Sequence, residues 1–346
     1  MMAEVSLRDE IQSQPSVLGR FVDESWGEVA DVASWMADLD FSHVVMAARG
    51  SSDNAARYAQ YLWGAHNALN VALAAPSLYT LYASPPDLTG SLVIGISQSG
   101  ESPDLLAVVE SARKQARPTL AITNNPGSPM AGLADRHLDI AAGPEMAVAA
   151  TKSYTNQLLA VAALSAALDG GDDLHDMLRA VPDTVAGTLD RNDRIAEAAR
   201  ALRDETRCVA IGRGYNHSTA FEWALKIAEL SYMVAQPFSA ADFRHGPLAL
   251  VEPGLAVLAV ATDGPLFEDV ADLIEVVRAG GARVTAISDR EDCPADDLVL
   301  LPSQLPEWLT PIPVTVAAQV FTYHLTVARG HDPDDPRAIH KVTKTV

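Results

Sequence analysis

The chain has 346 residues, of which 48% are hydrophobic, and a formal net charge of −20 from 25 basic and 45 acidic side chains. This length predicts two domains of roughly 150 residues each. No run approaches the roughly 18 uninterrupted apolar residues that a membrane helix needs. The acidic balance argues against a nucleic-acid partner, which requires clustered lysine and arginine. We therefore expect a soluble protein that binds neither membranes nor nucleic acids.

The N-terminal residues and the cysteines indicate the cellular compartment. The start, MMAEVSLRDEIQSQPS, lacks the basic residues and following apolar stretch of a signal peptide, so we expect a cytoplasmic protein. Cys208 and Cys293 are far apart and neither belongs to a C-x-x-C pair. We expect both to be reduced and partly buried rather than joined in a disulfide. No spacing of His, Asp or Glu indicates a metal site, and no cofactor is expected.

Short β-rich runs alternate with longer segments of helical period. The runs in the first half are HVVMAARG (43–50), SLVIGIS (91–97), RPTLAITNN (117–125) and HLDIAAG (137–143). Helical patterns such as SSDNAARYAQYLW and DLLAVVESARKQ follow the first two runs. This alternation is typical of α/β architecture with a mainly parallel sheet.

The second half of the chain repeats the first at a nearly constant offset. Gly214 in RCVAIGRG falls 214 − 50 = 164 residues after Gly50 in SHVVMAARG, and Val257 falls 257 − 93 = 164 residues after its counterpart in SLVIGIS. In a third pair of segments, GARVTAISD and QARPTLAITN, the offset is 165. Three segments in the same order predict two homologous α/β subdomains, each doubly wound.

The domain boundaries follow from this repeat and from composition. We expect an N-terminal segment at 1–24, the first subdomain at 25–170 and the second at 206–330. Residues 171–205 lack a Gly/Ser-rich composition and are expected to form helices that bridge the two subdomains. Residues 331–346 carry no helical period, so we expect an irregular tail that closes on the site.

Two polar corners follow strands of the first subdomain. They are RGSSDN (49–54) and SQSGESPD (97–104). In open parallel sheets, ligands gather at the carboxyl ends of the strands, and the N–H groups that open the next helix attract anions. Ser, Asp and Asn are also the commonest helix N-caps, so one such corner indicates little. Two corners in one subdomain, the second with Ser97, Ser99 and Ser102, favour an anion site.

The segment ISQSGESPDLL (96–106) contains no lysine or arginine. We therefore expect hydroxyls and backbone amides, without a basic side chain in reach, to bind the single terminal phosphate of a sugar.

A charged stripe lies on the predicted helix TAFEWALKIAELSY (219–232). Glu222, Lys226 and Glu229 are spaced by four and three residues, so a helix places them on one face. A solvated ion-pair ladder is the commoner meaning of such a stripe. Large apolar side chains surround this one, which favours a proton-transfer site.

His245 and Lys341 are weaker candidates when taken alone. His245 lies in FRHGPLAL, in a predicted turn before an apolar run, where a histidine can move protons. Lys341 and Lys344 belong to the irregular tail, where a frayed terminus is the ordinary interpretation.

These motifs, taken in order, resemble one family. GSS, SQSGES, EMAVAATKSYTNQL, FEWALKIAELSY, DFRHGPLAL and DPDDPRAIHKVT are similar to the sugar isomerase (SIS) family, and in particular to the isomerase half of glucosamine-6-phosphate synthase. The resemblance extends from about residue 10 to the end of the chain. It implies two SIS subdomains, each a three-layer αβα sandwich, in agreement with the internal repeat.

The resemblance also implies roles for particular residues in binding a hexose 6-phosphate or an amino-sugar 6-phosphate. Glu229 matches the base that moves a proton between sugar carbons 1 and 2, with Lys226 as its catalytic companion, and His245 matches the histidine of ring opening. Lys341 matches the tail lysine that forms an imine with the ketose. The residues matched to substrate binding are Ser51, Ser52, Ser97, Gln98, Ser99, Ser102, Val148, Ala149 and Glu222. The family donates its histidine across a dimer interface, which implies a homodimer.

Some features depart from the synthase. The sequence shows no glutaminase domain, so we do not expect glutamine-dependent synthesis from this chain alone. Ala150 stands where the synthase has serine, which removes one hydroxyl from the sugar pocket. His340 replaces a small residue before Lys341, which affects the shape of the tail.

The preferred hypothesis is an amino-sugar-phosphate deaminase and isomerase that converts glucosamine 6-phosphate to fructose 6-phosphate and ammonia. A deglycase for fructosamine 6-phosphate and a deaminase for galactosamine 6-phosphate remain alternatives with the same phosphate loop and base. A non-catalytic protein that senses a sugar phosphate is an alternative of another class. The set of Glu222, Lys226, Glu229 and His245 favours the enzyme, because a sensor does not need it.

Overall fold

The computed structural model describes residues 5–170, 172–302 and 305–341. Its contacts divide the chain into two compact units. The first-sheet unit contains residues 16–145, 152–179 and the chain from His340 onward. The second-sheet unit contains the chain up to Pro15, together with residues 146–151 and 180–339.

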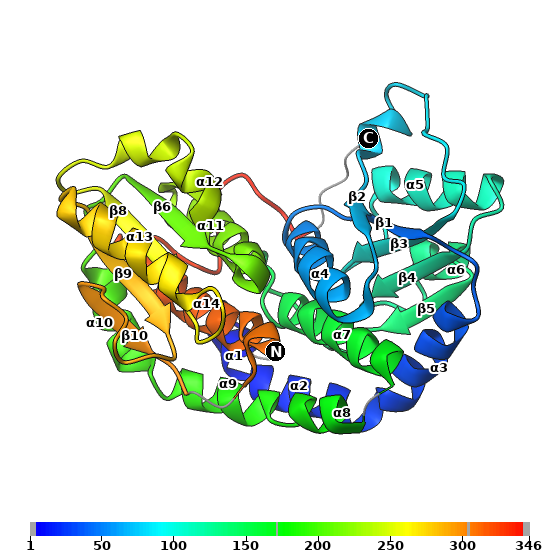
Figure 1. Ribbon diagram of the computed structural model, residues 1–346, viewed down its shortest axis with the longest axis horizontal. Helices are drawn as coiled ribbons and strands as arrows, with labels where there is room; N and C mark the ends of the chain where they lie inside the picture. Colours follow the sequence, from blue (N-terminus) through cyan, green and yellow to red (C-terminus); the bar gives the residue numbers. More distant parts are fainter. Residues whose placement is uncertain (1–4, 171, 303–304, 342–346) are drawn as a thin grey trace. The chain divides into compact units, whose positions relative to one another are not determined.

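Each unit is built around a five-stranded sheet in which every pairing is parallel (Figure 1). The strand orders are β2-β1-β3-β4-β5 and β7-β6-β8-β9-β10. The strands of the first sheet are β1 (His43–Ala47), β2 (Val71–Leu73), β3 (Ser91–Ser97), β4 (Thr119–Thr123) and β5 (Arg136–Asp139). Those of the second are β6 (Arg207–Gly212), β7 (Val234–Ser239), β8 (Ala256–Val260), β9 (Arg283–Ser288) and β10 (Asp297–Leu300).

The two sheets share their hydrogen-bonding register as well as their strand order. Val44 pairs with Leu92 in the first sheet, and Cys208 pairs with Ala256 in the second. Both members of the second pair lie 164 residues after their counterparts, because 208 − 44 and 256 − 92 give the same number. A one-residue slip would turn every side chain of a strand to the other face of the sheet. The shared register confirms the predicted duplication and the predicted parallel α/β fold.

Helices cover the strands of the first sheet, and β3 and β4 are buried along their whole length. Continuous apolar strands such as these are typical of parallel sheets with both faces covered. One face packs on α5 (Pro103–Lys114), and the cluster there includes Val93, Val108 and Met130. The helices of this unit are most of α2 (Gln14–Glu24), α3 (Trp26–Ala37), α4 (Ser51–Asn67), η1 (Pro76–Leu78), α5 (Pro103–Lys114), α6 (Pro129–Leu133), α7 (Lys152–Asp169) and α8 (Asp172–Leu178).

The second sheet packs on two sets of helices. The larger cluster includes Trp223 of α11 (His217–Ser231) and Phe321 of α14 (Pro311–Ala328), whose rings meet edge to face with centroids 5.2 Å apart. The other cluster joins the sheet to α12 and α13 through Phe243 and Ile274. The helices of this unit are α1 (Leu7–Gln12), α9 (Val181–Leu189), α10 (Asn192–Arg200), η2 (Gly214–Asn216), α11 (His217–Ser231), α12 (Ala240–Arg244), η3 (Pro247–Leu250), α13 (Phe267–Ala279), η4 (Glu307–Leu309) and α14 (Pro311–Ala328).

The predicted tail has neither helix nor strand from His331 to Lys341. Within the second-sheet unit, polar contacts nevertheless hold it. The carboxylate of Asp334 accepts a hydrogen bond from the Leu7 backbone N–H, and the Arg337 N–H donates to the Tyr232 hydroxyl at 2.9 Å. The Arg337 guanidinium also lies 4.3 Å from the centroid of the Tyr232 ring. The tail is irregular in backbone but fixed in position up to Arg337.

Candidate active site

The predicted polar corners lie at the topological switch point of the first sheet. The chain runs from β1 outward to β2 and then returns to β3 on the other side of β1. Ligands of open α/β sheets bind at the carboxyl ends of the two strands beside such a reversal. Ser51 and Ser52 open α4 just after β1, and the loop Gln98–Ser102 follows β3. Because β1 and β3 are paired neighbours, the two corners share one edge of the sheet.

The loop after β3 is folded by its own hydroxyl groups. The Oγ of Ser97 accepts a hydrogen bond from the Gly100 N–H at 3.1 Å, and the Oγ of Ser99 accepts from the Glu101 N–H at 3.3 Å. Gly100 has a φ of 65°, and a Cβ at that position would lie 2.3 Å from Ser128 Oγ. Only glycine therefore fits this turn.

Of the polar side chains at the two corners, some form hydrogen bonds with described residues of the first-sheet unit and some do not. The buried Ser52 Oγ accepts a hydrogen bond from Gln157 Nε2 at 3.0 Å. The side chains of Gln98 and Ser102 form no hydrogen bond with any residue that the structure describes. The α5 helix begins at Pro103, directly after Ser102, so its first N–H groups lie at this loop.

One basic residue lies at these corners, contrary to the sequence interpretation. Arg49, two residues after β1, places its Nε 2.8 Å from the carboxylate of Asp104 in the first turn of α5. The side chain of Asp104 is fully buried, whereas that of Arg49 is 51% exposed. The expectation of no basic side chain in reach was wrong because the partners are 55 positions apart in sequence. The fold brings their two strand ends together.

The charged stripe of α11 lies in the second-sheet unit. Lys226 Nζ is 2.5 Å from Glu229 Oε2 and 3.5 Å from Glu222 Oε1. The side chains of Lys226 and Glu222 are 4% and 2% exposed, and that of Glu229 is 24% exposed. The stripe is therefore not a solvated ladder. Two of its charges are buried together and one carboxylate reaches the surface.

Among the described residues, no polar contact joins His245 to this stripe. It ends α12, its side chain is exposed, and Gly246 follows it with a φ of 134°. Its imidazole forms no hydrogen bond or ion pair within the described part of the chain. The second-sheet unit therefore does not join His245 to Glu229 by any polar contact.

Lys341 forms an ion pair within the first-sheet unit that the sequence did not predict. Its Nζ lies 2.6 Å from Glu145 Oε2, and the same carboxylate accepts hydrogen bonds from the Ser153 N–H at 3.0 Å and the Ser153 hydroxyl at 2.7 Å. Burial raises the pKa of Glu145, but the Lys341 ammonium and the Ser153 donors outweigh it, so the pKa lies below its usual value. An acidic residue in the otherwise uncharged stretch AAGPEMAVAAT was the available signal.

Val148 and Ala149 lie in the segment after Glu145, in the second-sheet unit. Ala149 is buried and Val148 is partly exposed. The carboxylate of Glu10 accepts hydrogen bonds from the backbone N–H groups of Met146 and Ala147, which fixes the start of this segment. The loop is positioned by backbone contacts rather than by its own side chains.

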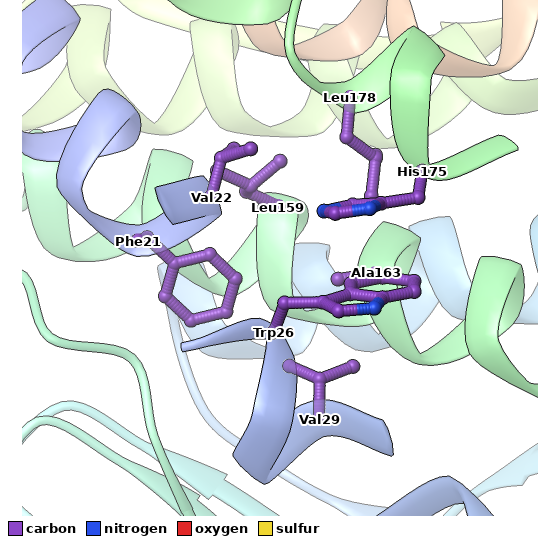
Figure 2. A pocket seen from close by; sticks show the side chains of 8 residues that line it. All are labelled: Phe21, Val22, Trp26, Val29, Leu159, Ala163, His175 and Leu178. Atoms are coloured by element: carbon purple, nitrogen blue, oxygen red, sulfur yellow. The ribbon is translucent and has the colours of Figure 1, made fainter. Parts of the chain in front are cut away.

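A small cavity elsewhere in the first-sheet unit is a packing feature rather than a ligand site. Figure 2 shows His175 stacked on Trp26, and the centroids of the two rings are 3.8 Å apart. The space beside them is about 10 Å³ and is lined mostly by apolar side chains such as Phe21 and Leu159. Ligand pockets are larger by more than an order of magnitude.

Two further findings concern the described residues alone. Nowhere in residues 5–170, 172–302 and 305–341 do three or more His, Cys, Asp or Glu side chains gather in an arrangement that could bind a metal ion. Within the same ranges, each helix is too short or too polar to span a bilayer. Cys208 and Cys293 are free and buried, and burial raises the pKa of Cys208 to about 12 and that of Cys293 to about 11.

Comparison with known proteins identifies the family. A model of the SIS domain matches residues 40–167 and 201–329, well over half of the chain. The chain belongs to the SIS domain family. Each matched range contains one of the two five-stranded sheets, so the duplication seen in the register corresponds to two SIS domains.

This SIS chain is similar in sequence to a longer protein. It is 37% identical over 345 residues to the glutamine–fructose-6-phosphate aminotransferase (isomerizing) of Thermococcus kodakarensis, in an alignment that covers 96% of this chain and 56% of that protein. The chain thus spans little more than half the length of this relative.

Two solved structures share the fold. The C-terminal domain of glucosamine-fructose-6-phosphate aminotransferase from Francisella tularensis has a TM-score of 0.88 at 25% identity and covers 95% of this chain and 98% of that one. The glucosamine-6-phosphate deaminase of Thermotoga maritima has a TM-score of 0.79 at 24% identity, with coverage of 98% and 99%. The latter likeness concerns the fold alone.

Proposed function

We propose that this SIS protein is a sugar-phosphate aldose–ketose isomerase that acts on glucosamine 6-phosphate, releasing fructose 6-phosphate and ammonia. The observation that carries the proposal is the α11 stripe. Lys226 is buried between two carboxylates, and only Glu229 reaches the surface. A carboxylate held by a buried ammonium beside an accessible face is suited to move a proton between adjacent carbons.

The reaction balances as glucosamine 6-phosphate plus water giving fructose 6-phosphate plus ammonia. After ring opening assisted by His245, Glu229 removes the proton from C2 of the open-chain aldehyde and delivers it to C1 through an enolamine. The C2 imine that results loses its ammonia to the amine of Lys341, and water then hydrolyses the Lys341 imine. Transfer of a proton by a positioned side chain contributes roughly 10²- to 10⁴-fold in rate. Lys226 stabilises the negative charge that develops during the transfer.

Residues of the first-sheet unit also have roles in this proposal. The Ser51–Ser52 corner and the Gln98–Ser102 loop bind the 6-phosphate. The side chains of Gln98 and Ser102, which form no hydrogen bond within the described part of the chain, support this assignment. Lys341 attacks C2 to form an imine with the sugar, which displaces ammonia before hydrolysis releases the ketose. A homodimer in which His245 completes the partner's site is part of the proposal.

The names of the relatives favour this substrate. The name of an aminotransferase for fructose 6-phosphate describes the transfer of an amino group to that sugar phosphate. The reverse of that bond formation releases ammonia and fructose 6-phosphate. Deglycation of fructosamine 6-phosphate and deamination of galactosamine 6-phosphate use the same phosphate end and the same base. A sugar-phosphate sensor without catalysis is the alternative of another class.

A substrate panel tests the proposal. The protein is incubated with glucosamine 6-phosphate, galactosamine 6-phosphate and fructosamine 6-phosphate, and ammonia and fructose 6-phosphate are assayed. In deuterated water, deuterium should appear at C1 of the fructose 6-phosphate, because the partly exposed Glu229 exchanges its proton with solvent. Tight binding of one sugar phosphate with no turnover of any would support the sensor and exclude the enzyme.

A further inference from the structure

Arg49 occupies a distinctive position in the first-sheet unit. It lies between the end of β1 and Ser51, at the edge of the sheet where β1 and β3 are neighbours. Its guanidinium reaches across to the first turn of α5, which begins directly after Ser102. The cation therefore spans the same two corners to which the phosphate is assigned.

Asp104 fixes the orientation of this guanidinium. One oxygen of the carboxylate accepts from the Arg49 Nε at 2.8 Å, and the other accepts from the Leu105 N–H at 2.9 Å. Asp104 is fully buried, so the acid lies beneath the arginine and the half-exposed guanidinium faces outward. A planar guanidinium held through Nε retains four N–H bonds on its two Nη atoms for a ligand.

Those Nη groups have no hydrogen-bond partner among the residues that the structure describes. The neighbouring side chains of Gln98 and Ser102 share this property. The loop also carries the exposed acid Glu101, on a chain with a net charge of −20. A phosphate dianion approaching this loop meets negative charge unless a cation offsets it.

We propose that Arg49 is a further substrate-binding residue whose guanidinium, held by Asp104, binds the phosphate group of the sugar phosphate. The inference rests on the proposed function for the identity of the anion. It changes the description of the phosphate site from neutral donors alone to neutral donors around one oriented cation. Arginine suits this role because its fork matches the oxygens of a phosphate.

Calorimetric binding at low ionic strength tests the inference with three probes: glucosamine 6-phosphate, inorganic phosphate and glucosamine. Arg49→Gln should raise the Kd for glucosamine 6-phosphate by roughly 10- to 100-fold, the loss expected for a charge-assisted hydrogen bond. Arg49→Lys should lose less. Arg57→Gln is the matched control, because Arg57 lies on α4, eight residues after Arg49, and likewise pairs with an aspartate, Asp53, at 3.0 Å.

Loss of Arg49 leaves the buried Asp104 unpaired, which destabilises the fold for a reason unrelated to binding. The double variant Arg49→Gln/Asp104→Asn removes that unpaired charge. We expect it to recover stability toward the wild type while its affinity for glucosamine 6-phosphate stays low.

Three results would overturn the inference. They are wild-type affinity in the double variant, an equal loss of affinity for glucosamine and for its 6-phosphate in Arg49→Gln, and the same loss in Arg57→Gln. Failure of the wild-type protein to bind either phosphate probe would overturn the phosphate site itself and, with it, the proposed function. Arg49-dependent phosphate binding without turnover would reject only the proposed reaction.

Discussion

The ammonium of Lys341 lies 2.6 Å from the carboxylate of Glu145, although the two residues are 196 positions apart. The side chain of Glu145 is fully buried, and Lys341 and Ser153 together supply it with three donors. A buried carboxylate is tolerated only with such partners. The pair places the tail lysine at a defined point. An imine-forming lysine must lose its proton before it attacks carbon.

We predict that Glu145→Gln separates Lys341 from its position without removing the lysine. The amide cannot form an ion pair, so we expect turnover of glucosamine 6-phosphate to fall by roughly 10- to 100-fold. Reduction with borohydride in the presence of fructose 6-phosphate, followed by mass analysis of the Lys341 peptide, should show less trapped adduct. Replacement of the adjacent, exposed His340 by alanine is the control and should leave the adduct yield unchanged. An undiminished yield in Glu145→Gln would show that Glu145 does not position the lysine.

The lowered pKa of Glu145 leads to a prediction about the pH dependence of stability. Its pKa is lower in the folded protein than the usual value near 4.5, so its contribution to stability is present above that value and is lost as the pH falls through the folded pKa. The difference in unfolding free energy between wild type and Glu145→Gln should therefore be largest near pH 7 and shrink below about pH 4.5. Urea titrations at pH 7 and pH 3.5 measure it. A pH-independent difference would contradict the assignment.

The fold was predictable from the sequence because the duplication repeats strands, register and offset, and because buried parallel strands form continuous apolar runs. The grouping of Glu222, Lys226 and Glu229 was predictable because helical spacing alone determines it. The Lys341–Glu145 and Arg49–Asp104 pairs were not. Each joins residues far apart in the sequence, and only the folded chain brings them together.

Lys226→Met should destabilise the second-sheet unit strongly. The buried ammonium balances Glu222, whose side chain is 2% exposed, and removing one partner of a buried ion pair costs about 3–5 kcal/mol. Lys226→Met/Glu222→Gln removes both charges and should recover part of that loss. Urea unfolding of the two variants at pH 7 gives the comparison. Equal stability of the single and double variants would mean that the charge of Glu222 has another partner when Lys226 is replaced.

Glu229→Gln should abolish most of the proton transfer while leaving the fold intact, because Glu229 is the partly exposed member of the stripe. We expect turnover to fall by roughly 10²- to 10⁴-fold with little change in the Kd of glucosamine 6-phosphate. Incorporation of solvent deuterium at C1 should fall in parallel. Glu275→Gln, an exposed glutamate within α13, is the control. Retained turnover in Glu229→Gln would assign the base to another residue.

The turn at Gly100 offers a matched pair of glycine variants. Gly100 and Gly143 have φ values of 65° and 68°, so alanine pays a similar backbone cost of about 1–2 kcal/mol at either position. Only at Gly100 does the new Cβ clash, with Ser128 atoms 2.3 and 2.6 Å away, whereas nothing lies within 4 Å at Gly143. Gly100→Ala should therefore lose about 1–3 kcal/mol more in unfolding free energy and should weaken phosphate binding. Equal effects of the two variants on binding would show that phosphate binding does not depend on the turn at Gly100.

Glu307 should respond to pH in the opposite sense to Glu145. Burial raises the pKa of this carboxyl, and the negative charges of Asp263 and Asp289 raise it further. An acid whose pKa is raised on folding stabilises the fold only when protonated, so its ionisation at neutral pH is a cost. Glu307→Gln removes that cost and should increase the unfolding free energy at pH 7 by about 0.5–1 kcal/mol, since the group is partly exposed. The gain should vanish near pH 4, where Glu307 is protonated in both states. Glu275→Gln is the control, because it changes an exposed acid of the same unit and should show no such pH dependence. If the stability gained by Glu307→Gln at pH 7 persists at pH 4, packing rather than charge is responsible.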